Sequence, residues 1–248
     1  ASAFAARRLV EDYGVPAARV VTIPNGVDLI RFRPMPDPAG LRARWRCEGR
    51  RVLLAASRLV PRKGFDRLIE ALPAIRARHP DALLLVVGEG PQRAELEAMA
   101  ARIGGEDAAR FTGAVPPEAM PDLHAMAELV VLPNRAEPGE ADGLPMVLLE
   151  AGACGRPVVA GLAGGTAEAV ADGVTGLLVD GNDPAAIAGS VLRVLDDRAL
   201  AARMGAAAAE RAKGWDWAAR TRTFLDVCGR DAPLLLPCDG EGIRRLTR

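Results

Sequence analysis

The fold is indicated by residues 51–91, which have the sequence RVLLAASRLVPRKGFDRLIEALPAIRARHPDALLLVVGEGP. Two apolar runs, 52–56 and 83–87, flank a segment, 64–78, in which apolar residues recur at helical spacing. Short unbroken runs of Val, Leu and Ala are typical of strands that are covered on both faces. A strand, a helix and a second strand of these lengths form a parallel crossover unit, so the sequence predicts an α/β fold.

The same alternation continues along the rest of the chain and predicts a doubly wound parallel sheet. The predicted strands are 19–23, 52–56, 83–87, 110–112, 129–132, 158–160 and 176–179. The predicted helices are 64–78, 91–103, 117–126, 145–154, 184–195, 198–213 and 217–227, and several of them begin at a proline, which favours the first turn of a helix. Ligands of such sheets bind beyond the carboxyl ends of the strands, so the loops that follow the strands are the candidate sites.

Composition argues against several classes of function. The chain has 248 residues, half of them hydrophobic, and its 32 basic and 32 acidic residues cancel. A neutral chain with few aromatic residues does not favour nucleic-acid binding. His79 and His124 are far apart and no CxxC pair occurs, so we expect neither a zinc site nor a disulfide framework, and no apolar run is long enough to span a membrane. The four cysteines, whose usage fits a reducing cytoplasm, are Cys47, Cys154, Cys228 and Cys238.

The two ends of the chain differ from its centre. The opening residues, ASAFAARRLVEDYG, are expected to form a helix already in progress at residue 1, so we expect the chain to begin inside a larger protein. We therefore divide the chain into an opening remnant of an inter-domain helix, residues 1–18, and an α/β domain with C-terminal helices, residues 19–230. Residues 231–248 have no clear periodicity and form a tail.

The first candidate loop, residues 56–64, follows a predicted strand and carries two cations, Arg58 and Lys63. Two cations at a ligand-facing loop suit a diphosphate, because that group needs charge-assisted hydrogen bonds. Taken alone, a solvated basic turn is the simpler interpretation. The assignment therefore depends on the neighbouring loops.

Glycines follow other predicted strands. Gly88 and Gly90 in VGEGP allow a ligand or another backbone to approach closely, but the dinucleotide fingerprint is incomplete, so a tight turn explains them equally well. The loop FTGAVP at 111–116 presents backbone groups that can contact the edge of a nucleobase. Gly164 and Gly165 precede a short helix, and their loop either closes over a ligand or is a flexible turn.

The richest loop is 133–143, PNRAEPGEADG, which leads into the helix predicted to start at Pro145. A long polar loop inside a compact domain is typical of a functional site. Unpaired amides at the start of the following helix, together with its dipole, favour an anion. Asp142 lies just before this helix, and Glu150 shares the face of Met146 near its start, so two carboxylates flank the predicted phosphate site and can bind sugar hydroxyls. Asp142 can also be read as a turn cap and Glu150 as a surface charge, although a lone carboxylate in so apolar a helix makes the second reading weaker.

Together these segments resemble the retaining GT-B glycosyltransferases of family 4. The resemblance rests on IPNGVD at 23–28, ASRLVPRKG at 56–64, VVGEGP at 86–91, FTGAV at 111–115, DGLPMVLLEAGACGRPVVA at 142–160 and GGTAEAVADGVTGLLV at 164–179, in unbroken order. The stretch ASRLVPRKGFDRLIEALP is especially similar to phosphatidylinositol mannosyltransferases. The resemblance implies a Rossmann-like domain that forms the C-terminal, donor-binding half of a GT-B architecture, with the acceptor-binding domain absent from this chain.

The resemblance also implies a role for each matched position. Arg58 and Lys63 would hold the donor diphosphate, and Glu150 would bind the ribose hydroxyls as the second glutamate of an E-x7-E motif. Asp142 takes the place of the first glutamate; it keeps the charge but is one methylene shorter, which puts its contact with the sugar ring in question, and neither Glu137 nor Glu140 has the family spacing. Arg58, Lys63 and Asp142 would be the catalytic residues. The other implied donor-binding residues are Gly88, Val115 at the base, and Gly143, Leu144, Pro145 and Met146 around the phosphates.

The implied function is transfer of a hexose from a GDP- or UDP-linked donor, with retention of configuration, to a lipid or glycan acceptor. No metal and no cofactor other than this donor substrate are expected. The expected partners are the sugar nucleotide and, through the missing domain, the acceptor and the membrane surface, with a cytoplasmic location at its inner face. The isolated chain is expected to bind nucleotide but to transfer sugar poorly or not at all.

Three alternatives remain open at this point. VGEGP alone supports an NAD-dependent oxidoreductase. Asp142 favours a decayed, non-enzymatic nucleotide-sugar-binding module that serves as a scaffold. An epimerase of the same GT-B architecture would also bind a sugar nucleotide, but its usual catalytic carboxylates and histidine cannot be located. The sequence leaves the base, the sugar and the acceptor undetermined.

Overall fold

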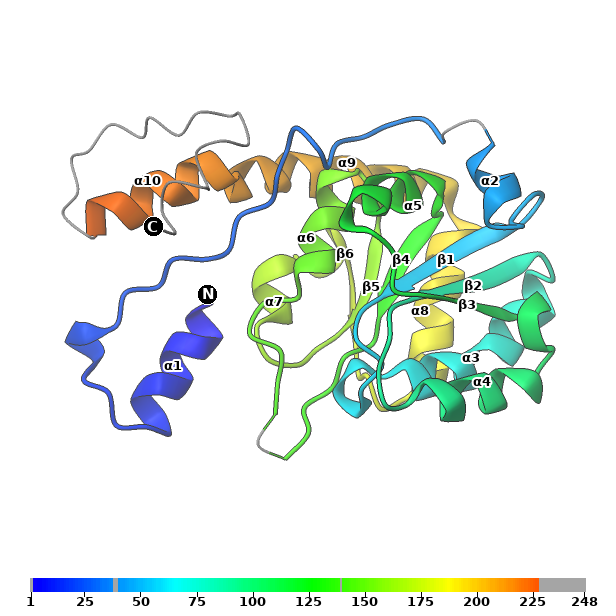
Figure 1. Cartoon of the computed structure of the whole chain (residues 1–248), viewed down its shortest axis with the longest axis horizontal. Helices are drawn as coiled ribbons and strands as arrows, with labels where there is room; N and C mark the ends of the chain where they lie inside the picture. The colour runs from blue at the N-terminus through cyan, green and yellow to red at the C-terminus, as the bar shows by residue number, and fades with distance from the viewer. Residues whose placement is uncertain (1, 38–39, 139, 228–248) are drawn as a thin grey trace, which may run out of the picture.

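The computed structural model describes residues 2–37, 40–138 and 140–227, and its centre is a six-stranded parallel sheet (Figure 1). The strands are β1 (Arg51–Ala56), β2 (Ala82–Val87), β3 (Ala109–Gly113), β4 (Leu129–Leu132), β5 (Val158–Gly161) and β6 (Gly176–Val179). They lie in the order β3-β2-β1-β4-β5-β6. The predicted α/β class and the doubly wound sheet are therefore confirmed.

Helices cover both faces of the sheet (Figure 1). Alternate strand residues point to opposite faces, so Leu53 and Ala55 pack with α3, α4 and α8, while Val52 and Leu54 pack with α5 and α6. This burial on both faces explains why the strands are unbroken apolar runs. The helices are α1 (Ala3–Glu11), α2 (Leu41–Arg44), α3 (Phe65–Arg78), α4 (Arg93–Ala101), α5 (Met120–Met126), α6 (Met146–Ala153), α7 (Thr166–Ala169), α8 (Pro184–Asp196), α9 (Arg198–Ala212) and α10 (Trp217–Val227).

The strand order reverses between β1 and β4. The chain adds β2 and β3 on one side of β1 and then returns to place β4 on the other side, with Leu53 opposite Leu129. A reversal of this kind leaves a crevice beyond the carboxyl ends of the two central strands. The loops 57–64 and 133–145 both begin at that crevice, so the topology brings the two richest polar segments together.

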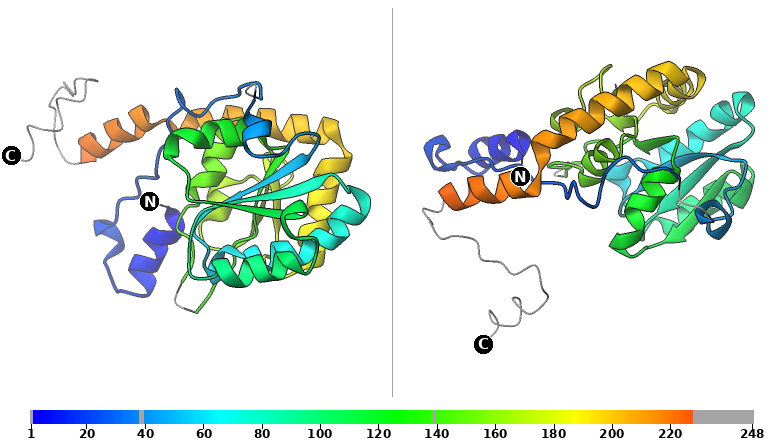
Figure 2. Two further views of the ribbon diagram at one scale, coloured as in Figure 1. Left: turned by 45° about the vertical axis from the view of Figure 1, so that its right-hand side comes forward. Right: turned by 90° about the horizontal axis from the view of Figure 1, so that it is seen from above.

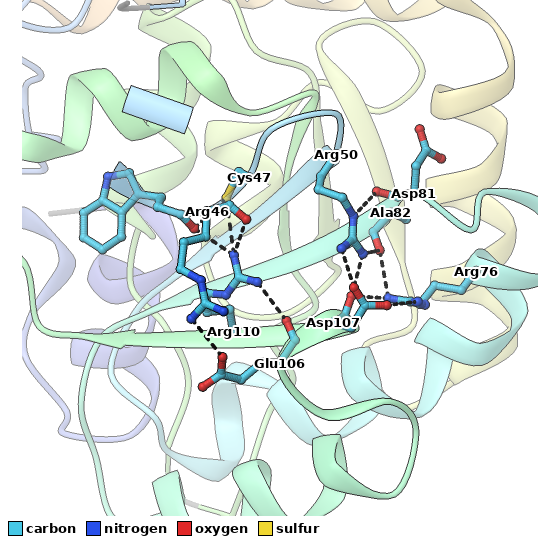
Figure 3. Close-up of polar contacts among 10 residues, drawn as sticks. Arg46, Cys47, Arg50, Arg76, Asp81, Ala82, Glu106, Asp107 and Arg110 are labelled. Atoms are coloured by element: carbon cyan, nitrogen blue, oxygen red, sulfur yellow. Dashed lines mark hydrogen bonds and ion pairs between the residues drawn. The ribbon is translucent and has the colours of Figure 1, made fainter. Parts of the chain in front are cut away.

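The opposite end of the sheet is held by arginine side chains (Figure 3). Arg50 Nη1 donates to Asp107 Oδ1 at 2.6 Å, and Arg76 Nη2 donates to Asp107 Oδ2 at 2.8 Å. Hydrogen bonds from Arg76 and Arg50 hold the pKa of the Asp107 carboxyl below its ordinary value. Arg110 donates to the carbonyl of Trp45. These contacts fix the turn before β3 against the starts of β1 and β2.

The strand predicted at residues 19–23 is wrong. Ala17–Arg19 form a short 3-10 turn, and the residues that follow are extended but belong to none of the sheet's strands. The apolar side chains of Val21 and Ile23 instead line a groove with Trp217 and Phe224 of α10. A short apolar run does not by itself distinguish a sheet strand from an extended segment that lines such a groove.

Several predicted helix ends also shift. α4 is shorter than the predicted 91–103, and the segment predicted as 117–126 starts as a 3-10 turn, Pro117–Ala119, with α5 following from Met120. α2 was not predicted, and the opening helix begins at Ala3 with Ser2 as its N-cap rather than being in progress at residue 1. Figure 2 shows α1 and α10 at the same end of the molecule. The tail from residue 231 lies outside the described residues, and no described helix has the length and apolarity to cross a membrane.

Candidate functional site

An open cleft of about 510 Å³ lies at the carboxyl ends of β1, β2 and β3, beside α6. Four of the residues predicted as donor-binding, Arg58, Gly88, Val115 and Glu150, line this one cavity. They come from four separate segments, and the sheet topology is what joins them. The remaining lining residues are Ala56, Ser57, Val87, Glu89, Ala114, Met120 and Val147.

Arg58 reaches the cleft because the backbone on either side of it is fixed. Ser57 N donates to Val87 O at 3.0 Å and Leu59 N donates to Glu89 O at 2.9 Å, so the loop after β1 runs beside the loop after β2. Gly88 has φ +134°, and a Cβ on it would lie 2.0 Å from Ser57 O. This close approach alone requires a glycine at position 88, and the exposed Arg58 side chain is left at the mouth of the cleft.

Lys63 does not line this cleft. Its Nζ lies 2.8 Å and 2.9 Å from the two carboxylate oxygens of Asp142, and the two side chains are 11% and 10% exposed. Arg62 joins the same group, with its Nε 3.4 Å from Asp142 Oδ1 and its Nη1 2.6 Å from Glu140 Oε2. Arg58 therefore lines the cleft, whereas the Lys63 ammonium is paired with Asp142.

The polar loop between β4 and α6 is firmly attached to α3. Arg135 Nη1 donates to both oxygens of Asp66 at 2.9 Å and 3.0 Å, and Arg135 N donates to Arg62 O at 2.8 Å. Asp66 belongs to the first turn of α3. The loop that carries Asp142 is thus held to the segment that carries Lys63, which keeps their ion pair in place.

The start of α6 has the character of an anion site. The sequence predicts that this helix begins at Pro145. In the structure Pro145 is the N-cap, and the helix begins at Met146. Proline has no side-chain acceptor, so the first amides of α6 receive no cap from it. Leu144 and Pro145 are buried, whereas Gly143 and Met146 are partly exposed.

The glycine loop after β5 packs against this same point. Gly165 N donates to Asp142 O at 2.9 Å, and a Cβ on Gly165 would lie 1.7 Å from Gly143 O. The N-terminal segment meets the same loop, because Glu168 accepts hydrogen bonds from Ala3 N at 2.8 Å and from Phe4 N at 2.9 Å. The loop after β5 is therefore held against the segment that leads into α6.

Glu150 lies one turn into α6, with its side chain 23% exposed and lining the cleft. One carboxylate oxygen is 3.8 Å from Nε2 of His124, a fully buried side chain on α5. Glu150 is therefore accessible from the cleft rather than sealed in the core. Glu150 shares this cleft with Arg58 and Val115.

Sequence reasoning missed several residues of the site. Arg62 stands next to Lys63 in the PRK turn and was not singled out, although its charge was visible. Glu89 lies between the two glycines of VGEGP. Met120 and Val147 are apolar residues that reach the cleft only through helix packing, so no local signal marks them.

Comparisons with known proteins agree with this geometry. Residues 41–211 match the family model described as Glycosyl transferases group 1. The chain is 44% identical over 230 residues to a GDP-mannose-dependent alpha-(1-6)-phosphatidylinositol monomannoside mannosyltransferase of Mycolicibacterium smegmatis, with 91% of this chain and 60% of the relative covered. It is 36% identical over 239 residues to a D-inositol 3-phosphate glycosyltransferase of Salinispora tropica, with 89% of this chain and 48% of the relative covered.

A solved structure shows a similar fold. The Anabaena protein Alr3699/HepE, crystallised in complex with UDP and glucose, superposes with a TM-score of 0.80 at 27% sequence identity. The match covers 88% of this chain and 59% of that protein. The chain thus spans between 48% and 60% of the length of these three proteins.

Proposed function

Because the chain belongs to the group 1 glycosyl transferases, we propose that its cleft binds the nucleotide diphosphate of a sugar donor. The observation that carries this proposal is the convergence of Arg58 and Glu150 on one cavity beside α6. A cation, a carboxylate and a helix start in one cleft are complementary to phosphates and to sugar hydroxyls.

We assign the parts of the donor to the parts of the cleft. The base lies against Val115, and the ribose hydroxyls donate to Glu150. The diphosphate accepts hydrogen bonds from Arg58, from Lys63 and from the backbone between Gly143 and Met146. Lys63 is paired with Asp142. A bound phosphate therefore either shares the Lys63 ammonium with the Asp142 carboxylate or displaces that carboxylate from it.

The proposed reaction is transfer of a hexose with retention of configuration to a lipid or glycan acceptor. Cations and a helix start stabilise the negative charge that develops on the leaving diphosphate, and no further cofactor is assigned. The name of the Mycolicibacterium relative makes GDP-mannose the first donor to test, and the UDP in the Anabaena structure makes UDP-glucose the second. A phosphatidylinositol acceptor is a membrane lipid, so we place the reaction in the cytoplasm, at the inner face of the membrane.

The donor proposal is tested by calorimetric titration of the chain with GDP, UDP, ADP and NAD. A ligand that binds the native state also raises the melting temperature by mass action, so thermal shifts give a second readout. We expect GDP or UDP to bind and NAD not to bind. Binding of NAD alone would favour an oxidoreductase, and binding of none of the four would contradict the proposal.

Transfer by the chain alone is tested separately. We expect the chain to hydrolyse or transfer sugar from GDP-mannose or UDP-glucose slowly or not at all, since it spans only 48% to 60% of the length of these relatives. Rapid turnover with a lipid or glycan acceptor would show that the chain itself binds the acceptor.

A further inference from the structure

His124 is a buried histidine whose polar atoms are unsatisfied. Its side chain is 0% exposed, and neither Nδ1 nor Nε2 has a hydrogen-bond partner among the described residues. A buried polar group without a partner is unfavourable, and most such groups in proteins are paired. An unpaired imidazole this close to a ligand cleft therefore needs an explanation.

Phe32 and Glu150 lie near the imidazole of His124. The ring of Phe32 packs against it edge-on, at 6.0 Å between centroids and an angle of 71°. Glu150 lies near its Nε2, with 3.8 Å between Nε2 and Oε2. Closing this distance by about 0.6 Å would bring the pair within ordinary hydrogen-bond range.

Glu150 thus has two sides. Its carboxylate lines the cleft, and His124 lies behind it in the core. The geometry points to His124 as a positioning residue for Glu150, an inference that rests on the proposed ribose contact of Glu150. Once the gap of 3.8 Å closes, the imidazole Nε2–H would donate to Oε2 and orient the carboxylate so that it accepts hydrogen bonds from both ribose hydroxyls.

The orientation has a physical basis. A glutamate side chain has several rotatable bonds, and α6 fixes only its backbone. A site that must accept two adjacent hydroxyls needs its carboxylate held by a second contact, as in other preorganised sites. Phe32 and the buried position of α5 hold the imidazole, so the imidazole can hold the carboxylate.

The test compares two nucleotides in the unchanged chain and in four variants. The ratio of the Kd for 2′,3′-dideoxy-GDP to the Kd for GDP, or the same ratio with UDP if the chain prefers uridine, measures what the ribose hydroxyls contribute. It is determined by calorimetry for the unchanged chain, Glu150→Ala, His124→Phe and His124→Gln. His124→Phe keeps an aromatic ring beside Phe32 but removes the donor, and His124→Gln restores an amide donor near the position of Nε2. His79→Gln, at the other histidine, is the matched control, because His79 contacts Asp196 outside the cleft.

We expect the ratio to be about tenfold or more in the unchanged chain and near one in Glu150→Ala. His124→Phe should lower the ratio by about threefold or more, His124→Gln should recover most of it, and His79→Gln should leave it unchanged. A structural role for His124 would weaken both nucleotides equally and leave the ratio intact, which would overturn the inference alone. A ratio that Glu150→Ala leaves unchanged would overturn both the ribose assignment and the inference. Should His124→Phe fail to fold, His124→Gln compared with His124→Leu decides the same question.

Discussion

Lys63 and Asp142 form a nearly buried ion pair at the start of α6. Nζ lies within 2.9 Å of both carboxylate oxygens, and each side chain is only about a tenth exposed. The segment after β1 and the loop after β4 are thus joined by opposite charges at the place where a phosphate is proposed to bind. Asp142 compensates the charge of Lys63, so we expect this carboxylate to weaken the attraction between Lys63 and a bound phosphate.

Replacing Asp142 by asparagine should separate stability from binding. The substitution leaves Lys63 charged and partly buried with a neutral partner, so the free energy of unfolding should fall by about 1–2 kcal/mol. It also removes a negative charge beside the phosphate site, so GDP should bind more tightly than to the unchanged chain. Urea unfolding and calorimetry measure the two effects. Glu140→Gln is the control, since that carboxylate is 64% exposed and its pair with Arg62 should contribute less than about 1 kcal/mol. Weaker GDP binding with unchanged stability would contradict the prediction.

Arg58→Ala should weaken GDP binding and leave stability almost unchanged. The side chain is exposed and lines the cleft, so its loss should change the free energy of unfolding by less than about 0.5 kcal/mol. GDP affinity should fall by about 1.5–3 kcal/mol for the lost charged hydrogen bond, while guanosine, which has no phosphate, should bind as before. Calorimetry with both ligands makes the comparison, and Arg102→Ala, an exposed arginine after α4, controls for net charge. An equal loss for guanosine would remove Arg58 from the phosphate site.

The sheet could be predicted from the sequence because its strands are buried on both faces. A run such as Leu83 to Val87 is apolar at every position, and glycines or prolines mark the turns that follow several such runs. The run at 19–23 also contains Val and Ile, as strands do, but it lines a groove with α10 instead of joining the sheet. Only the tertiary structure reveals this. The predicted helix starts moved by three residues at α5, from 117 to Met120, and by one at α6, from Pro145 to Met146.

The site could be predicted in part for a related reason. Parallel strands end at one edge, so Arg58, Gly88 and Val115 had to lie near each other once the strands were assigned, and Glu150 followed from the helix. The partner of Lys63 could not be predicted, because ion pairing between two loops depends on their exact path. His124 was missed because its approach to Glu150 depends on how α5 packs on α6.

Gly64→Ala should disturb the same region through the backbone. Gly64 has φ +70°, and a Cβ there would lie 2.1 Å from Pro133 O, at the base of the loop that carries Asp142. An alanine would be strained both by the left-handed backbone conformation and by the clash of its Cβ with Pro133 O. Together these should lower the free energy of unfolding by about 2–4 kcal/mol, and they should weaken GDP binding because Lys63 is the preceding residue. The matched control is Gly189→Ala, an exposed position in α8 where a Cβ meets nothing within 4 Å and should stabilise by about 0.5–1 kcal/mol. Equal stability of the two variants in urea would contradict the described loop packing.

The pH dependence of stability should carry a contribution from Asp107, at the end of the sheet away from the cleft. Hydrogen bonds from Arg76 and Arg50 lower the pKa of this carboxyl in the folded chain, whereas its pKa in the unfolded chain is about 3.9. The stabilisation is therefore present above about pH 4 and is lost as the pH falls through the lowered folded pKa. Asp107→Asn should be less stable than the unchanged chain at pH 7, by a small amount because the side chain is 65% exposed, and the difference should shrink below about pH 4. Urea unfolding from pH 3 to pH 7 measures it, with Glu118→Gln, an exposed carboxylate, as the control. A difference that stays constant over this range would mean that the two arginines do not favour the ionised carboxyl.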